Sequence, residues 1–63
     1  MIYISDSYNT KHWTNVQLKK PITQDQYDWL RGHEGGMFHI YRSGTAVKFE
    51  RKEDAEWFLL KIR

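Results

Sequence analysis

The dipeptide Ser43-Gly44 lies between two runs of strand-forming residues, and no other segment of the chain constrains the fold as strongly. Ser-Gly is a turn dipeptide, so the two runs predict a β-hairpin closed by a two-residue loop. In this register Phe38 faces Phe49, and His39 faces Lys48. Because alternate residues of a strand point to the same side of a sheet, the hairpin has one apolar face. That face carries Phe38, Ile40, Val47 and Phe49.

A further strand is predicted just before Pro21. Val16 and Leu18 alternate with polar residues, which directs both apolar side chains toward the core. The opposite, outer face of this strand carries Trp13, Asn15, Gln17 and Lys19. The outer face of the hairpin carries Met37, His39, Tyr41, Ala46, Lys48 and Glu50. If the strand lies beside the hairpin, aromatic and basic side chains share one side of the sheet.

Two segments carry helical patterns. The capping box formed by Thr23 and Gln26 predicts a helix from Thr23 to Arg31, with Gly32 as its stop. A second helix begins near Arg51, because apolar residues then recur with the spacing of one helix face. These residues are Ala55, Phe58, Leu59 and Ile62.

The segment Ile2-Tyr3-Ile4 is a candidate for one more short strand, so the predicted order is β-β-α-β-β-α. This order indicates one small α+β domain over residues 1–63. We expect an antiparallel sheet of three to four strands with two helices on one face. The expected core consists of Ile2, Ile4, Val16, Leu18, Tyr27, Leu30, Phe38, Ile40, Val47, Phe49, Ala55, Phe58, Leu59 and Ile62.

Length and composition narrow the class of protein. The 63 residues, 40% of them hydrophobic and 29% charged, suit a single small domain. The chain has no cysteine, which excludes disulfides and thiolate zinc sites. No apolar run approaches the roughly 20 residues of a membrane span. The N-terminal residues lack a basic segment followed by an apolar stretch, so we expect no signal peptide, no membrane partner and a cytoplasmic protein.

No pattern of a catalytic site is visible. The histidines at positions 12, 33 and 39 lack the i, i+4 spacing of a helical metal-binding pair. Gly35-Gly36 lacks both the longer pattern and the following helix of a phosphate-binding loop. A chain of this length also has little room for a walled pocket with supporting residues. We therefore expect no enzymatic activity, no metal and no cofactor.

Trp57 departs from the amphipathic pattern of the C-terminal helix. At roughly 100° per residue it lies about 160–200° from the centre of the core stripe. Leu60 follows it at i+3, Glu53 precedes it at i−4 and Lys61 follows at i+4. Trp and Leu on a solvated face are typical of a protein contact, since Trp is enriched at binding hot spots. Three candidates could cover this face of the helix: the N-terminal segment, a second copy of the chain, or a foreign protein.

The outer face of the sheet supports a different hypothesis. Its interleaved aromatic and basic side chains are Trp13, His39, Tyr41, Lys48 and Lys19. Such side chains stack on unpaired bases and hold phosphates. The net charge of +2 is small for a nucleic-acid-binding protein, and the glycine-aromatic run of the RNA-recognition motif is missing. An ordinary amphipathic outer face is the alternative.

The segment Val47-Lys48-Phe49-Glu50-Arg51-Lys52-Glu53-Asp54-Ala55-Glu56-Trp57-Phe58-Leu59-Leu60 resembles the C-terminal end of short accessory open reading frames of tailed, T4-like bacteriophages. Those frames often close with a strand, a polar capping residue, Asp-Ala and an aromatic-Leu run. The similarity covers about a quarter of the chain, and Arg51 departs from the expected Asn or Asp cap. The resemblance implies a small accessory protein that acts on a host or phage macromolecule.

These patterns favour a non-enzymatic protein-binding module, such as a phage accessory protein that inhibits or redirects a host protein in the host cytoplasm. Its expected partner-binding residues are Trp57, Leu60, Glu53 and Lys61. Association with a second copy is a further possibility. The alternative is a single-stranded nucleic-acid-binding domain that uses the outer sheet face.

Overall fold

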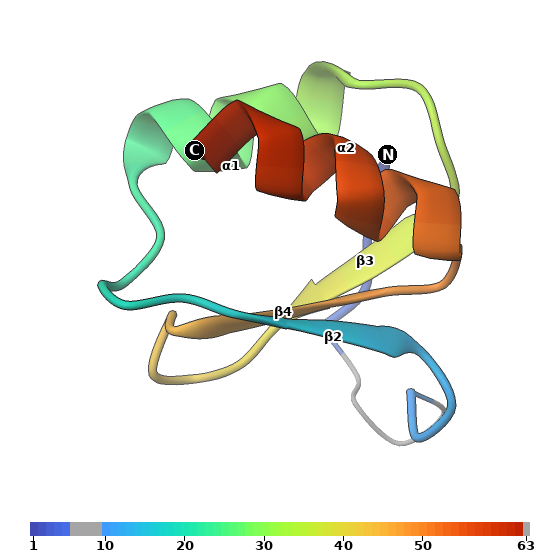
Figure 1. The fold of residues 1–63 in the computed structure, drawn as a ribbon, viewed down its shortest axis with the longest axis horizontal. Coiled ribbons are helices and arrows are strands. Elements are labelled where there is room, and N and C mark those ends of the chain that lie inside the picture. The colour runs from blue at the N-terminus through green and yellow to red at the C-terminus, as the bar shows by residue number, and fades with distance from the viewer. Residues whose placement is uncertain (6–9, 63) are drawn as a thin grey trace.

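A sheet and a pair of helices form the two layers of the fold (Figure 1). The computed structural model describes residues 1–5 and 10–62, which form four strands and two helices. Their bounds are β1 (Ile2–Tyr3), β2 (Thr14–Gln17), α1 (Gln24–Gly32), β3 (Met37–Ile40), β4 (Ala46–Phe49) and α2 (Lys52–Ile62). This is the predicted α+β class and the predicted order of elements. Both helices lie on one face of the sheet (Figure 1).

The predicted hairpin register is confirmed. Phe38 pairs with Phe49, and His39 pairs with Lys48 in the antiparallel ladder of β3 and β4. The connecting loop is longer than the predicted two residues, because the N–H of Tyr41 donates to the carbonyl of Ala46 at 3.0 Å and so leaves residues 42–45 as the loop. Gly44 has a φ of 73°, a left-handed conformation that glycine adopts without a steric penalty.

The strand β2 lies beside β4, and the inward direction of its apolar residues is also confirmed. Val16 pairs with Val47, and Asn15 pairs with Lys48. Val16 and Leu18 are buried, whereas Asn15 is exposed. The order of strands across the sheet is therefore β1-β3-β4-β2.

The strand β1 corrects two details of the prediction. It runs parallel to β3, so the sheet is mixed and not wholly antiparallel. Tyr3 pairs with Phe38, and paired residues share a face, so the tyrosine ring and not the isoleucines lies on the core side. Ile2 was expected in the core but is 66% exposed, and Ile4 is only half-buried.

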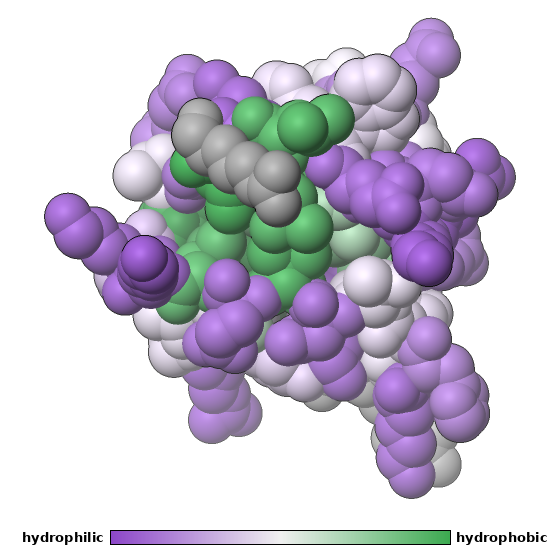
Figure 2. Space-filling model, in the orientation of Figure 1, coloured by the Kyte–Doolittle hydropathy of each residue, from purple (hydrophilic) through white to green (hydrophobic). Residues whose placement is uncertain are grey.

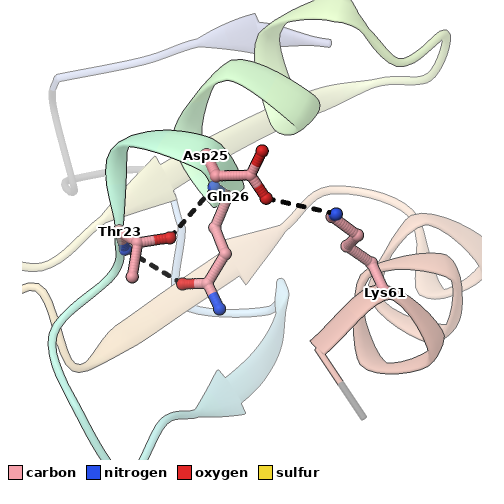
Figure 3. A network of polar contacts seen from close by, with 4 residues as sticks. All are labelled: Thr23, Asp25, Gln26 and Lys61. Atoms are coloured by element: carbon pink, nitrogen blue, oxygen red, sulfur yellow. Dashed lines mark hydrogen bonds and ion pairs between the residues drawn. The ribbon is translucent and has the colours of Figure 1, made fainter.

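The helix α1 begins at the predicted capping box. The Thr23 N–H donates to Gln26 Oε1 at 3.0 Å, and the Gln26 N–H donates to Thr23 Oγ1 at 3.2 Å (Figure 3). These bonds satisfy two amides that a helix start would otherwise leave unpaired. The predicted stop at Gly32 is wrong: Gly32 is the last helical residue, and the extended residue His33 caps the helix.

The two helices run antiparallel and lie side by side above the sheet (Figure 1). Lys61 Nζ in the last turn of α2 lies 3.2 Å from Asp25 Oδ2 in the first turn of α1 (Figure 3). Because the Asp25 side chain is 81% exposed, solvent screens this ion pair and it adds little stability. Apolar packing against the sheet therefore provides most of the energy that holds the helices in place.

Three phenylalanines fill the centre of the core. Phe38, Phe49 and Phe58 have no exposed surface, and the rings of Phe49 and Phe58 lie 5.5 Å apart between their centroids. The other buried members of the predicted core are Val16, Leu18, Leu30, Val47 and Ala55. Partly buried residues of the prediction that pack around them are Tyr27, Ile40, Leu59 and Ile62.

We predict that Phe49→Ala lowers the free energy of unfolding by about 3–5 kcal/mol, because it opens a cavity between the sheet and α2. Such a loss approaches the whole stability of a small domain. Chemical denaturation followed by Trp fluorescence measures the effect. Ile2→Ala, at an exposed position of β1, is the control and should leave the midpoint nearly unchanged. Equal midpoints for Phe49→Ala and the wild type would contradict this description of the core.

Candidate functional site

The outward face of α2 exposes two large apolar side chains. Trp57 is 54% exposed and Leu60 is 61% exposed, as the helical period predicts. Phe58 and Ala55 on the opposite side of the same helix are buried. We call Glu53, Trp57 and Leu60 the outer α2 surface. Both side chains stay exposed in the presence of the described N-terminal residues, so these residues do not cover the outer α2 surface.

A row of aromatic rings supports Trp57 from the side of α1. The ring centroids of Trp57 and His33 lie 6.0 Å apart, and His33 stacks on Trp29 at 4.5 Å with an interplanar angle of 16°. Trp29 in turn lies 6.0 Å from Phe58 in the core. The row therefore links the exposed indole to buried packing.

Sequence reasoning missed the supporting residues His33 and Trp29. A signal for their contact was present, because they stand four residues apart at the end of α1 and such residues share a helix face. No comparable signal connects His33 to Trp57, since 24 positions separate them. That contact depends on how the loop after α1 packs on α2.

A buried carboxylate fixes this loop. Asp54 is 4% exposed, and its Oδ2 accepts a hydrogen bond from the N–H of Gly36 at 2.8 Å. A Cβ at Gly35 would lie 2.6 Å from Asp54 Oδ1, which is too close for any side chain. Asp54 stands in the first turn of α2, and through the N–H of Gly36 it binds the loop that begins at His33.

The two charged residues of the predicted partner surface lie in different surroundings. Glu53 is exposed and stands one helical turn before Trp57. Lys61 pairs with Asp25 of α1, so its charge is directed between the two helices. Glu53, Trp57 and Leu60 therefore form one surface, and Lys61 lies beside it in an intramolecular ion pair with Asp25.

An apolar hollow opens next to the C-terminal half of α2. Figure 2 shows hydrophobic side chains gathered in the middle of this side of the molecule and framed by hydrophilic ones. The hollow has a volume of about 520 Å³, and its apolar lining includes Leu18, Leu59 and Ile62. Lys19, which follows β2, also lines it, together with Gln17 of the outer sheet face.

The outer sheet face is partly covered. His39 is only 6% exposed, and its Nδ1–H donates to the Ile4 carbonyl at 2.7 Å. Lys48 Nζ donates to the Thr10 carbonyl at 3.3 Å and lies 5.3 Å from the centre of the Tyr41 ring. Trp13 is half-buried just before β2, at the opposite edge from β1. The five predicted nucleic-acid-binding residues therefore do not form one open platform.

Two general features of the described residues bear on the chemistry. Within residues 1–5 and 10–62, no group of three His, Cys, Asp or Glu side chains gathers closely enough to hold a metal ion. In the same part of the chain, neither helix has the length and apolar character needed to cross a membrane.

No family model, curated protein or solved structure matches the chain. Its function is therefore inferred from the surfaces described above.

We predict that Asp54→Ala lowers the free energy of unfolding by about 1–3 kcal/mol, because the buried Gly36 N–H loses its acceptor. Amide hydrogen exchange at Gly36 should become faster in the same variant. Asp54→Asn keeps an acceptor oxygen and should cost less. Glu53→Ala removes the same charge from the neighbouring exposed position and serves as the control. An effect of Asp54→Ala no larger than that of Glu53→Ala would show that the Gly36 bond is unimportant.

Proposed function

We propose that this protein is a non-enzymatic binding module that contacts another protein through the outer α2 surface. The observation that carries the proposal is the pair of exposed apolar side chains, Trp57 at 54% and Leu60 at 61%, one helical turn apart. Natural surfaces seldom expose so much of a tryptophan beside a leucine without using it. Full burial of one such side chain contributes about 1.5–3 kcal/mol to an association.

The contacts around Trp57 also support this function. Side chains that are already ordered lose little conformational entropy on binding, so more of the contact energy appears as affinity. Trp57 contacts His33, which stacks on Trp29, and Asp54 holds the loop that carries His33. Trp57 is therefore arranged as an anchor residue, the role in which tryptophan dominates many protein interfaces.

The expected partner is a host or phage protein, which the binding would inhibit or redirect. This expectation rests on the resemblance of residues 47–60 to the C-terminal end of short phage reading frames. A convex helix such as α2 fits a groove on the partner, with Trp57 and Leu60 as the inserted side chains and Glu53 at the rim. A second copy of the chain is the other candidate for the partner.

We predict that Trp57→Ala abolishes partner binding and leaves the thermal midpoint nearly unchanged, because over half of the side chain lies in solvent. Leu60→Ala should weaken binding to a smaller extent. Ile2→Ala is the matched control, since Ile2 is 66% exposed on β1 and outside the outer α2 surface. Affinity capture from nuclease-treated host lysate measures the foreign partner. Sedimentation across a concentration series measures self-association.

The combination of results is decisive. A dominant protein captured by the wild type and by Ile2→Ala, but not by Trp57→Ala, supports the proposal. Concentration-dependent dimerisation with the same response to Trp57→Ala identifies a second copy as the partner. A large fall in the stability of a monomeric Trp57→Ala protein would overturn the proposal, because the indole would then belong to the core. Equal binding by wild type and Trp57→Ala would also overturn it.

A further inference from the structure

A cleft lined by three tyrosines lies at the β1 edge of the sheet, away from the outer α2 surface. Its volume is about 850 Å³, and its lining includes Tyr3, Tyr27, His39, Tyr41 and Arg42. We call it the tyrosine cleft. Tyr3 comes from β1, Tyr27 from α1 and Tyr41 from the residue after β3, so three distant parts of the chain meet here. None of these tyrosines was connected to the others by the sequence patterns.

The rings in the tyrosine cleft are arranged around His39. Tyr3 lies nearly parallel to His39 with 6.4 Å between ring centroids, and Tyr41 meets His39 edge-on at 5.8 Å. Tyr27 meets Tyr3 edge-on at 6.3 Å. Tyr3 is 40% exposed and Tyr41 is 36% exposed, so each offers ring surface to solvent. The cleft therefore presents two partly exposed aromatic rings next to one buried imidazole.

The charged side chains of the described residues that line the cleft or lie over its tyrosine rings are positive. Its lining contains Arg42 and, among the described residues, no carboxylate. Lys48 Nζ lies 5.3 Å from the centre of the Tyr41 ring, and the guanidinium of Arg31 lies 5.8 Å from that of Tyr27. Arg42 forms no ion pair with any other described residue. An aromatic cage for a cationic ligand would need the opposite sign of charge, so the site suits a planar, uncharged ring that is attached to an anionic group.

Hydrogen-bonding groups of the cleft remain available. Within the described residues, the hydroxyls of Tyr3, Tyr27 and Tyr41 have no hydrogen-bond partner. His39 donates through Nδ1 to the Ile4 carbonyl and is only 6% exposed, so the hydrogen-bonding groups offered to a ligand are the tyrosine hydroxyls. A hydroxyl can both donate and accept, which matches the mixed donors and acceptors on the edge of a nucleobase.

We propose that the tyrosine cleft binds unpaired nucleotides of a single-stranded nucleic acid. Tyr3 and Tyr41 stack on bases, while Arg42 neutralises a phosphate. A strand fits better than a free nucleotide, because the two exposed rings beside His39 offer two stacking positions. This site includes no residue of α2 and goes beyond the protein-binding function proposed above. It also differs from the outer sheet face of the sequence hypothesis, since Trp13 and Lys19 have no part in it.

The test is fluorescence anisotropy with a labelled, mixed-sequence single strand of about 12 nucleotides at low salt. We expect Tyr41→Ala to weaken binding by about 5- to 150-fold, which corresponds to the loss of one stacked base. Tyr41→Phe keeps the ring and should retain most of the affinity. Tyr3→Ala should act like Tyr41→Ala, but Tyr3 also packs on Phe38, so the exposed Tyr41 is the decisive position.

The salt dependence tests the role of Arg42. Arg42→Gln should reduce the slope of log affinity against log salt concentration by about 0.7, the value for one lost contact to a single strand. Lys19→Gln removes the same charge from the other cavity and should leave the slope unchanged. Trp57→Ala should bind the strand as the wild type does, which separates this test from that of the outer α2 surface.

Three results would overturn the proposal. The first is no binding of the wild type to the single strand at low salt. The second is equal binding by wild type, Tyr41→Ala and Arg42→Gln. The third is a competing nucleoside monophosphate or a duplex that binds as tightly as the strand, since the cleft would then recognise a free nucleotide or only phosphate charge. Weak competition by both, together with the expected loss in Tyr41→Ala, supports the proposal.

Discussion

The packing of Phe49 against Phe58 joins the two layers of this protein, and the positions of both candidate surfaces depend on it. Phe49 also pairs with Phe38 across the hairpin, so one buried side chain fixes the register of the sheet and the position of α2. A shift of one residue in β4 would turn Phe49 to the outer face and remove the contact. With Phe58 held inward, the helical period sends Trp57 outward. The exposure of Trp57 thus follows from the burial of Phe58 in the core.

The features that the sequence predicted correctly are those that depend on residues close together in the chain. The hairpin register follows from alternation around Ser43-Gly44, and the start of α1 follows from the capping box of Thr23 and Gln26. The direction of Trp57 follows from the apolar stripe of a single helix. In each case the relevant period or spacing is shorter than about a dozen residues, so local physical rules decide the outcome.

The features that the sequence did not predict depend on contacts between distant segments. Nothing in residues 2–4 indicates that β1 pairs in parallel with β3, and this pairing puts Tyr3 on the core side in place of Ile2 and Ile4. Glycine as a C-terminal stop suggested that α1 ends before Gly32, but the helix includes Gly32, and the N–H of His33 donates to the Trp29 carbonyl. The burial of Asp54 depends on a partner amide 18 positions away. The tyrosine cleft could not be predicted for the same reason, because it exists only once β1 has its partner and face.

The two candidate surfaces lie on different structural supports, and this bears on how they can act together. The outer α2 surface is held by the Trp29–His33 stack and by Asp54, whereas the tyrosine cleft is held by the β1–β3 pairing and the hairpin. The two share no residue, but α1 carries both Tyr27 of the cleft and Trp29 of the stack, and the Ile2 N–H of β1 donates to the carbonyl of Gly36 in the loop that Asp54 holds. Tyr41 and Trp57 share no partner among the described residues, so changes at these two exposed positions should be additive. A protein bound at α2 and a strand bound at the β1 edge could then occupy the same molecule without competing for side chains.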